Sequence, residues 1–305
     1  MSERRYLAPL PLGGDEWPPF SKGLMARALA ATGLPLTRAY ELARRADADL
    51  QERNADGLDL DRLAELAVEV LGEPDASRTI RRLRRLQALQ NLDLPIVLLV
   101  GGATGTGKST LATEIAHRLG ITRVTSTDFI RQTMRAFFSK EFMPSVHYSS
   151  FDTKLALTKA EEEEAGDPVL LGFLDQTRNV LVGVEAAIER ALEEGWSTVL
   201  EGVHLVPGML RTDYENALVV HCVAAISDEE LHRSHFWVRD RATEGLRPLE
   251  KYVDGLPEIR LLQDAILERA HRFDVAVIEN VAFDEAIGEI MDLVLTRAER
   301  LVRAS

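Results

Sequence analysis

Cysteine is almost absent from this chain, because Cys222 is the only one among 305 residues. A single cysteine excludes an intrachain disulfide and a cysteine-based metal cluster, and it suits a reducing compartment. Long apolar runs are also missing, since none approaches the roughly 20 residues that a membrane span needs. The opening stretch MSERRYLAPLPLGG lacks the apolar centre of a signal peptide. We therefore expect a cytoplasmic protein without a membrane partner.

Positive charge is scarce, with 36 lysines and arginines against 49 acidic residues and a formal net charge of −13. Because like charges repel, this balance argues against a general affinity for nucleic acid or for anionic membranes. A small anionic ligand must then be met by a local positive site. The seven histidines show no H-E-x-x-H spacing, so we expect no zinc held by the protein. No pattern indicates the oligomeric state.

The two parts of the chain differ in their apolar periodicity. Residues 1–92 show helical spacing throughout and no strand pattern, with predicted helices at 21–31, 36–50, 59–71 and 77–89. Residues 93–305 alternate long helical patterns with short apolar runs at 96–100, 123–127, 198–201, 218–226 and 275–279. Such runs are typical of parallel strands covered on both faces. We predict a small all-helical domain over 1–92, followed over 93–305 by an α/β domain with a parallel sheet flanked by helices.

The first apolar run leads directly into the glycine-rich stretch GGATGTGKST. It fits the motif G-x-x-x-x-G-K-[ST], whose glycines let backbone N–H groups curl around phosphate oxygens at the start of a helix. Lys108 can bridge the β- and γ-phosphates, and the Ser109 hydroxyl can bind Mg²⁺. The alternative is a strand-to-helix turn without a ligand. The predicted nucleotide-binding residues are Gly102, Ala103, Thr104, Gly105, Thr106, Gly107, Lys108, Ser109 and Thr110.

Acidic residues end the next two predicted strands, where ligands of parallel sheets bind. Asp128 can accept the proton of an attacking hydroxyl or hold Mg²⁺, or it can cap a helix that starts at Phe129. Glu201 occupies a position suited to an acid near the metal. Arg131 and Arg135, one helical turn apart, can bind an anionic acceptor. Three residues after Glu201, His204 is a candidate for substrate contact or a structural histidine.

A cluster of cations follows the fourth predicted strand, in the stretch HRSHFWVRDR. Arginines in such a cluster stabilise charge on a transferring phosphoryl group and close over the site as a lid. The predicted lid residues are Arg233, Arg239 and Arg241. The alternative is an exposed helix whose arginines pair with acids one turn away, such as Asp228 and Glu229.

Together these segments resemble the 2-phosphoglycerate kinase family. The resemblance is carried by PFSKGLMARAL, GTGKSTLATEIAHRLGI, TSTDFIRQTMR, SVHYSSFDT, VLEGVHLVPG, the His-Arg-x-x-Phe stretch, KYVDGLPEIRLLQD and VAVIEN. It implies an ATP-cone-like helical region joined to a P-loop kinase domain that phosphorylates 2-phosphoglycerate to 2,3-bisphosphoglycerate. It also implies that Ser149, Ser150 and Gln176 contact the substrate. His235 stands where we expect an arginine in the lid stretch.

The sequence thus predicts a kinase that uses ATP and Mg²⁺ and acts on a small phosphorylated anion. The predicted catalytic residues are Lys108, Asp128, Glu201, Arg233, Arg239 and Arg241. The predicted metal ligands are Ser109, Asp128 and Glu201, and the predicted substrate contacts are Asp128, Arg131, Arg135, Ser149, Ser150, Gln176 and His204. Two alternatives stay open: a kinase for another small anionic acceptor, and a nucleotide-dependent regulatory protein.

Overall fold

The computed structural model describes residues 10–13, 18–90, 92, 94–164, 166–242 and 249–304. The chain divides into two compact units. The first comprises residues 1–94, 114–122 and 283–305, and the second comprises 95–113 and 123–282. The units are therefore not two consecutive stretches, because two segments from later in the chain join the N-terminal helices.

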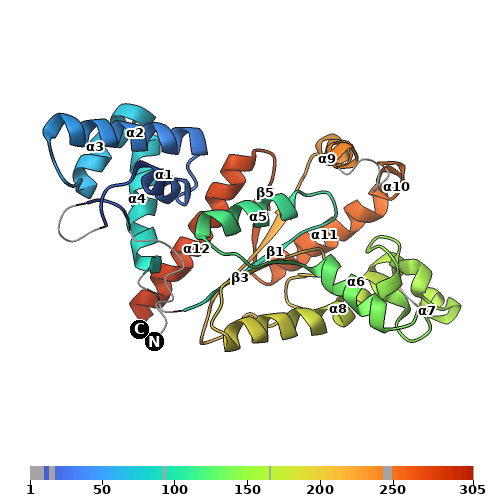
Figure 1. Cartoon of the computed structure of the whole chain (residues 1–305). Coiled ribbons are helices and arrows are strands. Elements are labelled where there is room, and N and C mark those ends of the chain that lie inside the picture. The colour runs from blue at the N-terminus through green and yellow to red at the C-terminus, as the bar shows by residue number, and fades with distance from the viewer. Residues whose placement is uncertain are drawn as a thin grey trace. The chain divides into compact units, whose positions relative to one another are not determined.

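The first unit is built from helices (Figure 1). They are α1 (Lys22–Ala30), α2 (Leu36–Arg53), α3 (Leu60–Leu71), α4 (Glu73–Gln90), the later part of α5 (Lys108–Leu119) and α12 (Phe283–Ala304). Side chains cap two of the helices, since Ser21 accepts from the N–H of Leu24 and Asp59 accepts from the N–H of Arg62. These caps satisfy N–H groups that the helix itself leaves free. The four helices predicted before residue 90 are confirmed.

Two arginines, of which Arg118 is buried and Arg82 is half-buried, connect the helices of this unit. Arg82 on α4 donates to the carboxylate of Asp292 on α12 and to the carbonyl of Thr32. Arg118 on α5 donates to the carbonyl of Ala30 at the end of α1, at 3.0 Å. Because a carbonyl at a helix end has no partner within the helix, a guanidinium there fixes how the next helix packs.

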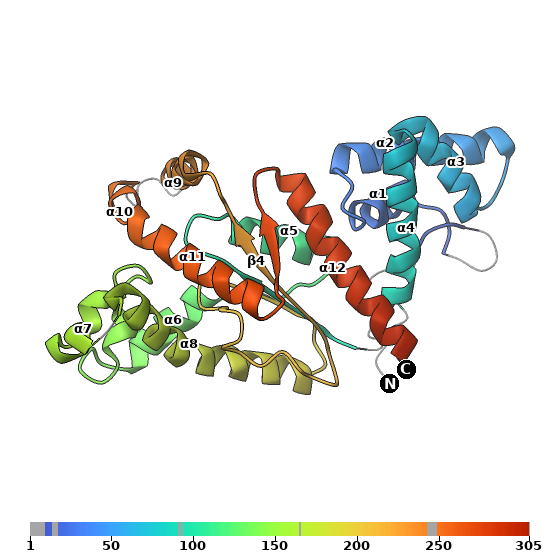
Figure 2. The ribbon, with the colours of Figure 1, turned by 180° about the vertical axis from the view of Figure 1, so that it is seen from behind.

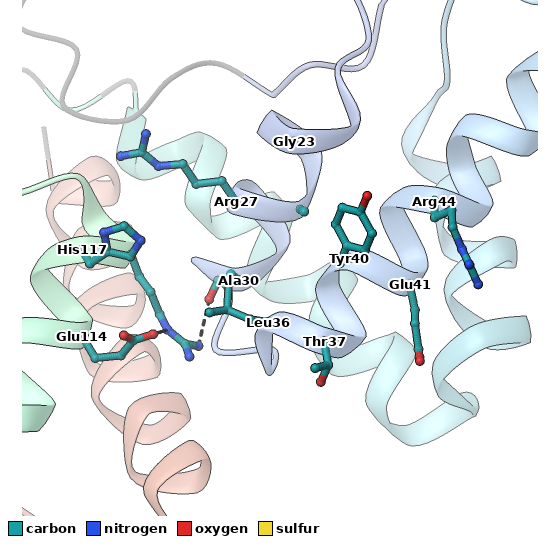
Figure 3. Close-up of a pocket in the computed structure, with 12 residues that line it drawn as sticks. Gly23, Arg27, Ala30, Leu36, Thr37, Tyr40, Glu41, Arg44, Glu114 and His117 are labelled. Carbon is teal, nitrogen blue, oxygen red and sulfur yellow. Dashed lines mark hydrogen bonds and ion pairs between the residues drawn. The ribbon is translucent and has the colours of Figure 1, made fainter.

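A cavity of about 710 Å³ lies among α1, α2 and α5 of the first unit (Figure 3). Its apolar floor includes Ala26, Ala30 and Leu36. The two acids on its wall, Glu41 and Glu114, are already paired, with Arg38 and Arg118. No residue that the sequence singled out for function lines this cavity.

The second unit contains a parallel sheet of five strands in the order β2-β3-β1-β4-β5. The strands are β1 (Ile96–Gly101), β2 (Val124–Ser126), β3 (Thr198–Glu201), β4 (Leu218–Ala225) and β5 (Ala276–Glu279). In the central register Leu99 pairs with Leu200 on one side and with His221 on the other. Every residue of β1 is buried, as expected for a strand with both faces covered. All five predicted strands are confirmed.

Helices and two 3₁₀ turns connect the strands of this unit. They are α6 (Thr127–Phe137), η1 (Pro144–His147), η2 (Thr153–Ala156), α7 (Lys159–Glu164), α8 (Pro168–Glu193), α9 (Glu229–Ala242), α10 (Leu249–Asp254) and α11 (Leu256–Arg272). Helix α8 packs its Val180 and Val184 in one core cluster with Leu99, and α11 packs its Ile259 and Leu262 in another. Figure 2 shows both helices along the sheet. The predicted α/β class is confirmed.

All strands of a parallel sheet end at the same edge, and this edge positions the site. The glycine-rich loop follows β1, Thr127 and Asp128 follow β2, and Gly202 follows β3. Within the described residues, no helix is long and apolar enough to cross a membrane. Cys222 is buried in β4, and burial raises the pKa of its thiol to about 12.

Candidate active site

The loop after β1 has the backbone of a phosphate-binding loop. Gly102, Gly105 and Gly107 have positive φ angles of 139°, 92° and 79°, a region that residues with side chains rarely adopt. A Cβ atom at Gly105 would overlap the ring of Phe236, and one at Gly107 would overlap the amide of Asn280. Glycine is therefore required here both by conformation and by space.

Lys108 begins α5 and turns back over the loop, where its Nζ donates to the carbonyl of Ala103 at 3.2 Å. The hydroxyl of Thr106, which is fully buried, donates to the same carbonyl at 3.0 Å. The loop is thus closed on itself, while the ammonium group of Lys108 still lines a cavity. An anion in that cavity can attract the lysine away from a neutral carbonyl, because charge-assisted hydrogen bonds are stronger.

This cavity, of about 410 Å³, lies at the carboxyl edge of the sheet. It brings together nine of the residues that the sequence singled out: Thr104, Lys108, Ser109, Asp128, Arg131, Arg135, Ser149, Ser150 and Glu201. Gln132, Tyr148, Lys251 and Tyr252 also line it. One wall is therefore the phosphate loop, and the others carry the carboxylates of Asp128, Asp152 and Glu201 and several cations.

Asp128 is not the helix cap that one interpretation of the sequence proposed. Helix α6 begins at Thr127, two residues earlier than Phe129, and the cap is Ser126, whose hydroxyl accepts from the N–H of Asp128. The cap interpretation is wrong because the polar residue at the strand end takes that position first. Asp128 lies in the first turn, where the positive end of the helix dipole favours a carboxylate.

The charges around Asp128 favour its ionised form. Partial desolvation at the cavity wall opposes the negative charge, but Arg131 and Lys108 outweigh it and hold the pKa of Asp128 below its usual value. The nearest cation is Arg131, whose Nε lies 3.2 Å from Oδ1. Asp128 is therefore a carboxylate at neutral pH and is able to accept a proton or bind a cation.

Arg131 is buried, and most of its guanidinium is already bonded. Besides Asp128, it donates from Nη1 to the carbonyls of Val146 at 2.9 Å and Tyr148 at 3.0 Å. These bonds hold the η1 segment against α6. Arg135, one turn further along α6, is exposed and also lines the cavity.

Gln176 and His204 lie behind the cavity wall. Both side chains have no exposed surface. His204 Nε2 donates to Gln176 Oε1 at 3.0 Å, and its Nδ1 accepts from the hydroxyl of Thr127 at 2.8 Å. The amide of Gln176 donates to the carbonyl of Tyr148 at 3.1 Å. Burial lowers the pKa of His204 to about 3, so the ring is a neutral link in a buried chain of hydrogen bonds.

Gly202 explains the close approach of β3 to α6. Its φ is 152°, and a Cβ atom would overlap the side chain of Thr127. Its N–H donates to the carbonyl of Val100 in β1 at 3.1 Å. The residue before it, Glu201, is buried and lines the cavity.

Lys251 is a cavity residue that was not among the predicted site residues, although it belongs to the cations that follow the predicted lid stretch. Its Nζ donates to the Ser149 hydroxyl at 2.9 Å and lies 3.1 Å from Oδ2 of Asp152. It also lies over the ring of Phe151. The stretch KYVDG was part of the resemblance, but only the packing of α10 against residues 149–152 brings its lysine to the site.

The donor set fits Mg²⁺ with a nucleotide. Ser109, Asp128 and Glu201 supply hydroxyl and carboxylate oxygens to one cavity, and such hard donors suit Mg²⁺. In the part of the chain that the structure describes, no group of three or more His, Cys, Asp or Glu forms a separate metal site. Mg²⁺ at phosphates does not need one, because it binds through one or two carboxylates, water and phosphate oxygens.

The lid residues are described only in part. Arg233 on α9 pairs with Glu229 at 3.3 Å, one turn away on an exposed face, which is the pairing that the alternative interpretation expected. The side chains of Arg239 and Arg241 lie outside the described residues. The lid therefore stays a prediction.

Three curated proteins are similar to this chain over most of its length. The 2-phosphoglycerate kinase of Methanopyrus kandleri is 36% identical over 282 residues, covering 92% of this chain and 84% of that protein. The one of Methanothermobacter thermautotrophicus is 38% identical over 276 residues, covering 90% and 89%. The one of Pyrococcus furiosus is 33% identical over 285 residues, covering 93% and 92%.

No family model matches the chain. Among solved structures, a gluconokinase from Sinorhizobium meliloti 1021 aligns with a TM-score of 0.39 and 17% identity, covering 70% of this chain and 98% of that one. The sequence relatives decide the assignment, since they match the chain almost from end to end. The chain belongs to the 2-phosphoglycerate kinase family.

Proposed function

We propose that this protein transfers the γ-phosphoryl group of ATP to the free hydroxyl of 2-phosphoglycerate, giving ADP and 2,3-bisphosphoglycerate, in the cytoplasm. One observation carries the proposal: a single cavity joins a phosphate loop, three carboxylates and a set of cations. A phosphorylated acid carries anionic groups at both ends. The cations Arg135 and Lys251 suit such an acceptor better than a neutral sugar, because Arg135 has no ion pair among the described residues and would stay unpaired beside one.

In this proposal each side chain has a separate task. Loop N–H groups and Lys108 bind the phosphates of ATP. Ser109, Asp128 and Glu201 hold Mg²⁺, which when bound draws charge from the phosphate oxygens. Asp128 also accepts the proton of the acceptor hydroxyl. As the oxygen of that hydroxyl bonds to the γ-phosphorus, the bond between this phosphorus and the oxygen of ADP breaks.

The acceptor is oriented by residues opposite the loop. Arg131 keeps Asp128 in place and holds the η1 segment, and its Nη2 has no bond among the described residues that would keep it from an anion. Arg135 and Lys251 meet the carboxylate and phosphate of the acceptor. Arg239 and Arg241 close over the transferring group from α9.

A product screen tests the proposal. Purified protein is incubated with ATP, Mg²⁺ and one acceptor at a time: 2-phosphoglycerate, 3-phosphoglycerate, glycerate or gluconate. ADP is measured by a coupled assay, and the mass of the phosphorylated product is determined by mass spectrometry. We expect acceptor-dependent ADP and a bisphosphorylated product with 2-phosphoglycerate, and neither with the Lys108→Ala control.

The alternatives give different results in the same screen. A kinase for another anion would phosphorylate a different member of the panel. A nucleotide-dependent regulatory protein would bind ATP without acceptor-dependent turnover. Either outcome contradicts the proposed acceptor, and the second contradicts catalysis altogether.

A further inference from the structure

Two histidines on α9 hold successive carbonyls of the phosphate loop. His232 Nε2 donates to the carbonyl of Thr104 at 2.8 Å, and His235 Nδ1 donates to that of Gly105 at 3.0 Å. A carbonyl oxygen can only accept, so each of these ring nitrogens carries a proton. The two histidines are three residues apart, which places them on the same face of the helix.

A third carbonyl of the loop is held from β5. Asn280 follows this strand and is buried, and its Nδ2 donates to the carbonyl of Thr106 at 2.9 Å. The carbonyl of Ala103 is bonded within the loop, to Thr106 and Lys108. The carbonyls of residues 103–106 therefore each have a donor, three of them from outside the loop.

Fixing these carbonyls also fixes the N–H groups that bind phosphate. In a trans peptide the C=O of one residue and the N–H of the next point in opposite directions. A carbonyl that is held in place at residues 104–106 therefore also sets the direction of the N–H group of the next residue. Within the described residues, the N–H of Thr106 donates to the carbonyl of Ala103 at 3.5 Å, whereas the N–H groups of Gly105 and Gly107 have no backbone partner. Free N–H groups in a concave loop of this kind bind anions.

His232 is buried although one of its ring nitrogens has no partner among the described residues. The residue is fully buried, and the nitrogen without a partner is Nδ1. An unpaired buried nitrogen destabilises the fold compared with an apolar side chain of similar size. The position of His232 against Thr104 thus indicates a task for its donor beyond packing.

We propose that His232, His235 and Asn280 are positioning residues that preorganise the phosphate loop for the nucleotide. The inference rests on the proposed function, because it concerns the ATP side of the same site. It also assigns the first turns of α9 to the wall of the loop. A loop without these bonds must be ordered by the nucleotide itself, and this weakens binding.

His235 gives the sharpest test, because it is half-buried and replaceable. His235→Leu removes the donor, whereas His235→Asn keeps an N–H near the position of Nδ1. The dissociation constants of ATP and of adenosine are measured by calorimetry, adenosine by displacement. We expect His235→Leu to weaken ATP about fivefold, as for one lost neutral hydrogen bond, and to leave adenosine unchanged. His235→Asn should restore most of the ATP affinity.

Asn280→Asp is the second variant. It keeps the shape but turns a carboxylate toward a carbonyl, so we expect a loss of ATP affinity of about tenfold or more. Ser234→Ala on α9 is the matched control, because within the described residues its hydroxyl bonds only to the carbonyl of Leu231. Thermal unfolding without ligand shows whether each variant is folded.

The outcomes separate the inference from the proposed function. Unchanged ATP affinity in folded His235→Leu and Asn280→Asp overturns the positioning role. An equal loss for ATP and adenosine overturns it too, because the bonds would then matter only for general structure. A wild-type protein that does not bind ATP overturns the proposed function instead, and the inference with it.

Discussion

Replacing Asp128 by asparagine removes one charge from the cavity and keeps the shape of the side chain. Because the cap of α6 is Ser126, the start of the helix should not change. The loss of a positioned base lowers kcat by roughly 10²-fold or more. We therefore expect Asp128→Asn to bind ATP nearly as the wild type does and to turn over at most about one hundredth as fast.

The expected effect of Asp128→Asn on stability is small. The Asp128 side chain is 54% exposed, so solvent screens its ion pair with Arg131, and we expect a contribution below about 1 kcal/mol. Arg131 also keeps its two carbonyl acceptors. In a protein of this size such a change lowers the Tm by roughly 2–4 °C at most. The fall in rate therefore cannot come from unfolding.

The assay compares kcat, the KM of each substrate and the Tm in parallel. The matched control is Asp213→Asn. It breaks an exposed ion pair in which Nε of Arg211 lies 3.1 Å from Oδ1 of Asp213, and neither residue lines the cavity. The control should leave the kinetics unchanged. A normal kcat in folded Asp128→Asn would refute the base, and Glu201 would be the next candidate.

The pH dependence of Asp128 follows from the direction of its pKa. Partial desolvation at the cavity wall raises the pKa, but Arg131 and Lys108 lower it more, so the folded value lies below the unfolded one. The stabilisation from this carboxylate is then complete above the ordinary aspartate pKa of about 4 and disappears as the pH falls through the folded value. The difference in unfolding free energy between wild type and Asp128→Asn should be constant above about pH 5 and shrink in acid, as urea titrations at each pH can check.

Other changes test the loop, the lid and the close contact behind the site. Lys108→Ala should abolish turnover in a folded protein, with a loss of about 3 kcal/mol or more of transition-state stabilisation; near-normal turnover would end the kinase proposal. Arg239→Ala and Arg241→Ala should lower kcat more than they raise the KM of ATP, and normal kinetics in both would remove the lid. Gly202→Ala should lower stability by about 2 kcal/mol or more in urea unfolding, because its Cβ would overlap Thr127; an unchanged midpoint would contradict the described backbone.

The sequence by itself determined the strands, the phosphate loop and the candidate acids. Apolar runs bounded by polar residues are local signals, and so is the spacing of glycines before Lys108. Because parallel strands end at one edge, the order of the segments alone places Asp128 and Glu201 near the loop. The resemblance to the kinase family then rested on the same segments.

Only the tertiary structure decided which side chains face the cavity and which lie behind it. Gln176 and His204 were predicted to contact the substrate, yet both are buried in a network with Thr127. Conversely, Lys251 reaches the cavity because α10 packs beside residues 149–152. Sequence spacing gives the face of one helix, but it does not give the angle at which that helix meets another.

The hydrogen bonds that hold the carbonyls of the phosphate loop were the feature that the sequence predicted least. His232 and Asn280 lie 128 and 174 positions from the carbonyls they hold, and a hydrogen bond between such distant positions leaves no periodic pattern. The same holds for α12, whose apolar stripe predicts a helix but not that it joins the N-terminal unit. Local periodicity determined the elements of this protein, whereas long-range packing decided which of them complete its site.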